Sequence, residues 1–258
     1  MNFDRTVDTL IVGTGNGALT AAVCLHQMGV TDLLVIEKSD KIGGTSARSG
    51  GGVWVPMNRY AQAAGAKDSR EDALAYLAAT IPPEDTPQAL IDTYVDNAPK
   101  MVEFLHQHSR VRYISLEHYP DYYTDRAGAR TGHRSMEPEP VMRDVVGEDW
   151  KFVNDTHPMI SMFGRIFVSQ VEAHEISTKS KGWVGVVAKI LAGYYLDWPW
   201  KFKQKVSRRM TCGGAGVMRL YWSCKERGIQ IERNTALQEL ITDDTGRVVG
   251  AVVQQNGK

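Results

Sequence analysis

A glycine-rich turn between a short apolar run and a helical stretch, near the amino terminus, constrains the fold more than any other feature. Residues 9–12, TLIV, form a continuous apolar run typical of a strand buried on both faces of a parallel sheet. The turn GTGNG follows, and residues 18–28 then have helical character up to Gly29, a residue expected just after a helix end. Residues 33–37, LLVIE, form a second apolar run. This order predicts a βαβ unit.

The turn also carries the spacing of a dinucleotide-binding fingerprint. Gly13, Gly15 and Ala18 form GxGxxA between the predicted strand and helix, and the acid Glu37 ends the next strand. The amides at the start of the helix are then expected to face a pyrophosphate. Glu37 is expected to contact a ribose. The fold class that follows is α/β, a Rossmann-like domain. The predicted phosphate contacts are Gly13, Gly15, Asn16, Gly17 and Ala18.

A second glycine cluster lies directly after the second strand. Residues 43–58 read GGTSARSGGGVWVPMN, and such a cluster marks either a tight internal turn or the close approach of a ligand. A plain NAD domain usually continues from its second strand into another helix, whereas small hydroxyl residues and bare amides suit a long, phosphate-bearing cofactor. This pattern favours FAD. Further predicted cofactor contacts are Lys38, Gly43, Gly44, Thr45, Ser46, Ser49, Gly50, Gly51 and Gly52.

The rest of the chain predicts mixed helices and strands. Helices are expected over residues 70–80, 87–108 and 213–227, a strand over 229–231, a long loop over 118–140, and a final hairpin, residues 237–242 and 247–253, around the turn DDTG. The second of these helices is predicted to bury Leu90, Ile91, Tyr94, Met101, Phe104 and Leu105. One more cofactor contact is expected at Ala236, at the start of the hairpin.

Composition excludes several classes of partner. The thirty basic and thirty acidic residues cancel, so no global field recruits nucleic acid. Three cysteines without CxxC spacing argue against a disulfide framework and favour a reducing, cytoplasmic compartment. We expect no metal site, because His106 and His108 face different directions on a helix and His174 lacks the second histidine of HExxH.

Three segments together resemble the 3-ketosteroid Δ1-dehydrogenases, within the fumarate reductase and succinate dehydrogenase flavoprotein superfamily. They are GTGNGALTAA, VIEKSDKIGGTSARSGGGVWVP and YPDYYTDRAGARTGHRSMEP. The resemblance covers residues 8–138 and 206–253. It implies dehydrogenation of the C1–C2 bond of a 3-ketosteroid, with hydride passing to flavin N5 and a proton to a tyrosinate. It also implies that this chain is an N-terminal portion, a truncated FAD-binding domain over residues 1–258, with a second catalytic domain beyond the chain end.

The same resemblance assigns a role to one tyrosine. Tyr122, the first tyrosine of DYY, matches the position whose hydroxyl assists the proton-abstracting tyrosine, while the base itself is expected beyond residue 258. From the residues alone, Tyr119, Tyr122 and Tyr123 could equally pack within a loop. No histidine between Gly43 and Trp54 is available to attach the flavin, so we expect dissociable, non-covalent FAD.

The resemblance leaves other functions open. Δ4-dehydrogenases and reductases of fumarate-like alkenes share this flavin-binding half, and a catalytically silent flavin-binding module is a further alternative. An external electron acceptor is expected for any of the dehydrogenases.

Residues 141–210 fit the resemblance least and are expected to be a mainly helical insertion. Residues 182–200 are apolar and aromatic, and the next nine residues are rich in lysine and arginine. The stretch suits either peripheral membrane contact through residues 182–209 or a core helix with a solvated basic end. Lys189, Asp197 and Pro199 argue against a transmembrane span.

Overall fold

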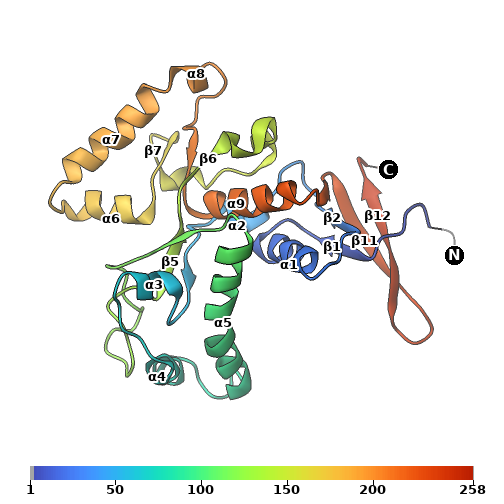
Figure 1. Cartoon of the computed structure of the whole chain (residues 1–258), viewed down its shortest axis with the longest axis horizontal. Coiled ribbons are helices and arrows are strands. Elements are labelled where there is room, and N and C mark those ends of the chain that lie inside the picture. Colours follow the sequence, from blue (N-terminus) through green and yellow to red (C-terminus); the bar gives the residue numbers. More distant parts are fainter. Residues whose placement is uncertain (1–2, 258) are drawn as a thin grey trace.

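A parallel three-stranded sheet lies at the centre of the fold in the computed structural model, which describes residues 3–257. Strand β2 (Leu33–Ile36) lies between β1 (Thr9–Val12) and β10 (Gln230–Glu232), and Thr9 is paired with Leu33 and Gln230 with Leu34. Helix α1 (Asn16–Gln27) connects β1 to β2. The predicted βαβ unit is therefore confirmed, with its third strand supplied from almost 200 residues further along the chain (Figure 1).

Helices are the longest elements in the remaining chain. The other helices are α2 (Gly44–Arg48), α3 (Arg59–Ala63), α4 (Arg70–Thr80), α5 (Gln88–His108), α6 (Gln170–Thr178), α7 (Trp183–Tyr195), α8 (Trp198–Lys201) and α9 (Cys212–Glu226), with 3₁₀ segments η1 (Arg143–Phe152) and η2 (Pro158–Ile160). Helix α4 has the bounds that the sequence predicts, because Ser69 caps its first turn by accepting a hydrogen bond from the Asp72 amide at 3.1 Å.

Short antiparallel strands build the smaller sheets. They are β3 (Val53–Trp54), β4 (Tyr113–Ser115), β5 (Ser135–Pro138), β6 (Val141–Met142), β7 (Ser161–Met162), β8 (Ile166–Phe167) and β9 (Arg209–Met210), paired as β3-β5-β4, β6-β9 and β7-β8. The predicted loop over residues 118–140 is wrong at its end, because β5 lies inside it. The predicted hairpin is confirmed as β11 (Thr235–Thr242) and β12 (Val248–Gln255).

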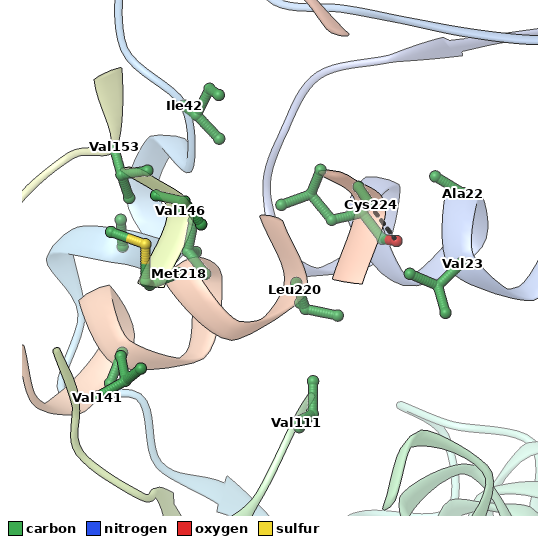
Figure 2. Packing of buried hydrophobic residues seen from close by; sticks show 14 of the residues in the cluster. Ala22, Val23, Ile42, Val111, Val141, Val146, Val153, Met218, Leu220 and Cys224 are labelled. Atoms are coloured by element: carbon green, nitrogen blue, oxygen red, sulfur yellow. Dashed lines mark hydrogen bonds between the residues drawn. The ribbon is translucent and has the colours of Figure 1, made fainter. Parts of the chain in front are cut away.

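Helix α9 is the central packing element (Figures 1 and 2). It crosses the molecule against α1 and α2, and its Val217, Met218, Leu220 and Cys224 are buried. In Figure 2 these side chains lie among apolar residues of α1, of η1 and of the turn after β2. The nucleotide-binding unit is therefore backed by a helix from the far end of the chain.

The predicted buried face of α5 is only partly right. Ile91 and Leu105 are buried, but Leu90, Tyr94 and Met101 are exposed. The buried stripe instead runs through Val95, Ala98 and Val102, small residues that let the helix approach the neighbouring strands closely.

Residues 141–210 divide between two hydrophobic clusters. Val146 and Val153 belong to the main cluster, whereas Ile166, Val168 and Ile190 form a separate one with α7. The segment is mainly helical, as predicted, but it also contains four short strands, and its first part belongs to the main core. In residues 3–257, no helix combines the length and the apolar character that crossing a bilayer requires.

Candidate functional site

The first glycine turn, residues 13–17, joins the end of β1 to the start of α1. Gly13 has φ +94°, a value that side chains disfavour, and its amide donates to the Ile36 carbonyl at 2.7 Å. This hydrogen bond holds the turn against the end of β2. The amide groups at the start of α1 are thereby presented beside the residues that follow β2.

Thr14 connects this turn to Glu37 and to the second glycine turn, residues 43–52. Its hydroxyl donates to the Glu37 carboxylate and accepts from the Gly43 amide at 3.0 Å, and its own amide donates to Glu37 at 3.1 Å. Ser39 N–H is a third donor to Glu37, at 3.0 Å. Thr14 and Glu37 are both buried. An ionised carboxylate has about four acceptor sites, so these contacts leave Glu37 with capacity for one more donor.

The two glycine turns are in direct contact. The Asn16 amide donates to Ser46 Oγ at 3.1 Å, and a Cβ placed on Gly15 would lie 3.2 Å from the same oxygen. Two segments that the sequence assigns to one cofactor, separated by about thirty residues, therefore form one continuous surface.

The glycines of the two turns fall into two groups. A Cβ on Gly43 would lie 2.8 Å from Val217, and one on Gly51 would lie 2.5 Å from the Gly213 amide, so α9 itself requires glycine at both. Gly17 and Gly50 have ordinary φ values and open space where a side chain would go. The sequence leaves two reasons open for the glycine cluster, internal packing and room for a ligand. The structure contains glycines of both kinds.

The other predicted cofactor residues lie around this surface. Ser49 Oγ donates to the Ser46 carbonyl at 2.8 Å, which shapes the second glycine turn from within. Ala236 follows Thr235, whose amide donates to the Glu37 carbonyl at 2.8 Å. Ala18 packs against the main hydrophobic cluster. Lys38, Gly44, Thr45 and Gly52 are exposed.

The surface fits a phosphate-bearing dinucleotide. A helix start faces it, Gly17 and Gly50 leave space, and Asn16 Oδ1 is buried with no hydrogen-bond partner among residues 3–257. A buried polar atom without a partner is costly, so a ligand that donates an O–H or N–H to Asn16 Oδ1, as a ribose hydroxyl can, would remove that cost.

A pocket of about 260 Å³ opens where the second glycine turn ends. Gly52 and Tyr122 both border it, so the predicted catalytic tyrosine is brought to the predicted cofactor residues. Tyr122 is 83% exposed. The other lining residues are Val53, Trp54, Tyr76, Leu77, Leu116, Tyr119, Pro120, Asp121, Ser135 and Gln170.

Tyr119 is paired with Tyr122 on one side of this pocket. Their ring centroids are 6.5 Å apart, and the hydrogen bond with Tyr122, together with partial burial, raises the pKa of the Tyr119 phenol. Ionising Tyr119 is therefore harder than ionising a free phenol.

Gln170 is a lining residue that the sequence does not reveal. Its side chain donates to the Gly50 carbonyl at 3.0 Å, and its amide donates to the Glu137 carboxylate at 2.7 Å. Glu137 is fully buried, and burial raises the pKa of its carboxyl group. The start of α6 is thus fixed beside the second glycine turn by two residues from segments predicted as loop and insertion.

Comparisons with known proteins agree with this geometry. Residues 8–258 match a family described as an FAD binding domain. A 3-oxosteroid 1-dehydrogenase from Comamonas testosteroni is 34% identical over 99% of this chain and 44% of the relative. A 4-oxocyclohex-2-ene-1-carboxylate 5-dehydrogenase from Sinomonas cyclohexanicum is 30% identical over 95% of this chain and 41% of the relative. This chain thus spans less than half the length of these relatives.

A solved structure is similar as well. The 3-ketosteroid Δ1-dehydrogenase of Sterolibacterium denitrificans, in complex with 1,4-androstadiene-3,17-dione, superposes with a TM-score of 0.90 at 37% identity, over 98% of this chain and 45% of that one. The resemblance to the 3-ketosteroid Δ1-dehydrogenases is confirmed. Because the family match extends over nearly all of its residues, the chain belongs to the FAD binding domain family, and its cofactor is FAD.

Proposed function

We propose that this chain forms the flavin-binding part of a dehydrogenase acting on the C1–C2 bond of a 3-ketosteroid. One observation carries the proposal: Tyr122 and Gly52 border the same pocket, at the end of the second glycine turn. Relatives named for this reaction, and a steroid complex of a similar structure, support it.

The chain's own residues would bind and orient the cofactor. The amides of Gly15 and Gly17 at the start of α1 would face the pyrophosphate, because those of Gly13, Thr14 and Asn16 already donate within the protein. The free acceptor site of Glu37 would bind a ribose hydroxyl, and residues 43–52 would contact the rest of the dinucleotide. Without a histidine between Gly43 and Trp54, the flavin would be held non-covalently. When bound, FAD supplies a hydride acceptor, which an external electron acceptor then reoxidises.

Tyr122 would assist proton removal. A phenol has a pKa of about 10, and a hydrogen bond from a second phenol to its ionised form lowers the cost of forming a tyrosinate. The exposed hydroxyl of Tyr122 is available for this role. Trp54, Leu77 and Leu116 would give the pocket apolar walls that bind a ring and exclude water.

The lining of the pocket favours a ring ketone over a small dicarboxylate. Fumarate-like acids need cationic partners, and the pocket lining within residues 3–257 includes no lysine, arginine or histidine. A catalytically silent module remains the alternative that the experiment below must exclude.

A second surface suits peripheral membrane contact. Residues 182–209 expose Leu196, Trp198 and Phe202 beside Lys201, Lys203 and Lys205, and aromatic side chains with neighbouring lysines are typical of proteins lying on anionic bilayers. A pocket of about 430 Å³ in the same region is lined by Arg165, Lys201 and Lys205, and could take an anionic headgroup. We propose this surface as the route by which an apolar substrate approaches.

The proposed activity has a direct optical test. The purified protein should show flavin absorbance bands that bleach when a 3-ketosteroid is added without an electron acceptor. In a version of the protein that spans the full length of its relatives, Tyr122→Phe should slow bleaching by about 10- to 100-fold while flavin occupancy persists, because it removes one hydrogen bond to a charged group.

Tyr123→Phe is the matched control, since Tyr123 is its exposed neighbour and does not line the pocket. A colourless protein that does not take up added FAD would refute the flavoenzyme. Equal bleaching rates in the Tyr122→Phe variant and the wild type would remove Tyr122 from the mechanism.

A further inference from the structure

The residue immediately before Tyr122 is tied to three other segments. The side chain of Asp121 is 1% exposed. Its Oδ1 accepts from Trp54 Nε1 at 2.7 Å, and its Oδ2 accepts from Arg134 Nη1 at 2.8 Å and from the Arg130 amide at 2.9 Å. One carboxylate therefore joins β3, the start of β5 and the far side of the loop that carries Tyr122.

Arg134 extends this network to Asp68. Its guanidinium is 2% exposed and forks onto the Asp68 carboxylate, with Nη2–Oδ1 at 2.7 Å and Nε–Oδ2 at 3.0 Å. Its charge also lies over the rings of Trp54, at 5.5 Å, and Tyr76, at 5.7 Å. Both aromatic residues line the pocket. The network thus fixes one wall of the pocket from behind.

The backbone of the loop that carries Tyr122 is closely packed at two glycines. We call residues 116–134 the tyrosine loop. A Cβ on Gly128 would lie 2.1 Å from the Asp72 carbonyl oxygen, and one on Gly132 would lie 1.8 Å from that of Glu117. The exposed Tyr122 side chain therefore projects from a loop whose backbone is packed closely against α4 at Gly128 and against itself at Gly132.

A buried network of this kind is weak evidence for stability, because removing charges from water offsets much of their attraction. Its value lies in geometry: five hydrogen bonds with defined directions orient Trp54 relative to the tyrosine loop. Tyr122 and Trp54 both line the pocket that the proposed reaction uses.

We propose that Asp121 is a positioning residue, which fixes Tyr122 and Trp54 relative to each other and thereby sets the geometry of the substrate pocket beside the second glycine turn. The proposal rests on the proposed function for its kinetic consequences. Its structural part, the fixing of the tyrosine loop, stands without that function.

The kinetic test compares two Asp→Asn variants of the FAD-loaded protein. Asp121→Asn keeps the shape but places an amide donor against a donor, either Trp54 Nε1 or the Arg134 and Arg130 groups. In a version of the protein that spans the full length of its relatives, we therefore expect kcat for a 3-ketosteroid to fall about 10- to 100-fold, with KM changing less. The FAD dissociation constant should stay within about twofold. Asp155→Asn is the control, because Asp155 pairs with the buried Arg143 outside the pocket, and its kcat should be unchanged.

A double-mutant cycle isolates the Trp54 contact. Trp54→Phe keeps an aromatic wall and removes only the Nε1 donor, so Asp121→Asn should cost less in the Trp54→Phe background than in the wild type. If the two fold-changes simply multiply, Asp121 does not act through Trp54 and this part of the proposal is overturned.

Hydrogen exchange distinguishes a failure of the proposed positioning role of Asp121 from a failure of the proposed function. In Asp121→Asn, amides of residues 116–134 should exchange faster while those of α9 keep their protection. Faster exchange with unchanged kcat would overturn the proposal, and so would unchanged exchange. If the wild type oxidises no 3-ketosteroid, the proposed function fails, and exchange confined to the tyrosine loop still decides whether Asp121 fixes it.

Discussion

At the scale of single residues, the Thr14 side chain connects Glu37 to the second glycine turn. One hydroxyl donates to Glu37 and accepts from Gly43, so it fixes the strand-end acid and the second glycine turn together. Thr14 is fully buried, so it shapes the cofactor surface without belonging to it. We expect the contact atoms to come from its neighbours, chiefly the amides of Gly15 and Gly17 and the Glu37 carboxylate.

This arrangement predicts that replacing a residue that contacts FAD weakens FAD binding more than replacing a nearby residue that does not. Glu37→Ala should raise the FAD dissociation constant by about 10- to 100-fold, because it removes a charged acceptor. Glu232→Ala, at the end of the neighbouring strand, removes a carboxylate paired at the surface with Arg5 and should leave FAD binding unchanged. Flavin fluorescence titration measures both. Equal dissociation constants for Glu37→Ala and the wild type would refute the ribose contact.

The sequence predicts some of these roles and misses others for a physical reason. Gly13, Gly15 and Glu37 can be predicted from the sequence because their fixed spacing on one βαβ unit determines where they lie. Thr14 occupies a position that the fingerprint leaves free. Positions 43 and 51 require glycine because α9 approaches them closely. This contact joins segments some 170 residues apart, so no short sequence pattern predicts it.

At the scale of elements, local signals predict helix bounds well and buried faces less well. The cap residue Ser69 precedes the acids Glu71 and Asp72, and α4 begins where these signals indicate. Helix α5 has apolar residues on more than one side, so periodicity does not decide which side is buried. The close packing of Val95, Ala98 and Val102 decides it, and leaves Leu90 and Tyr94 exposed.

The tyrosine loop should depend on pH through Asp68. Burial alone would raise the pKa of this carboxyl, but hydrogen bonds from Arg134 and from two backbone amides hold it below its ordinary value of 3.8. A carboxyl with a lowered pKa stabilises the fold fully above its unfolded pKa, and this contribution is lost as pH falls through the folded value. Protection of the loop should therefore persist at pH 5 and decline below about pH 4.

Asp68→Asn tests this assignment. It should lower the free energy of unfolding by about 3 kcal/mol near neutral pH, since it breaks a buried pair, and the difference from wild type should shrink below about pH 4. Asp96→Asn is the control, because the Arg70–Asp96 pair lies at the surface and should contribute little at any pH. Urea unfolding at several pH values measures both. A difference for Asp68→Asn that does not change with pH would contradict the prediction.

At the scale of the whole molecule, the two extensions lie on opposite sides of the core (Figure 1). Helices α6–α8 project at one side, and the β11–β12 hairpin projects at the other. The sequence predicts both as elements. The aromatic and basic surface near α8 arises because Tyr195, Trp198 and Phe202 remain exposed after folding, which local pattern alone does not determine.

Membrane contact should depend on that surface. The protein should co-sediment with vesicles that contain anionic lipid more than with purely zwitterionic ones, and added salt should weaken binding. Phe202→Ser should reduce the bound fraction severalfold, because it removes a large exposed apolar side chain. Leu240→Ser, at an exposed position of the hairpin, should not change binding. Equal binding by the two variants would rule out this surface as the point of contact.

The pairing of β10 with β2 affects the order in which the site can form during synthesis. Glu37 is held on its carbonyl and amide by Thr235 and Glu232, which the ribosome adds some 200 residues later. Contacts so distant in sequence form slowly and only after the intervening chain has emerged. Flavin capture should therefore wait until residues 230–235 have emerged and paired with the segment around β2 and Glu37.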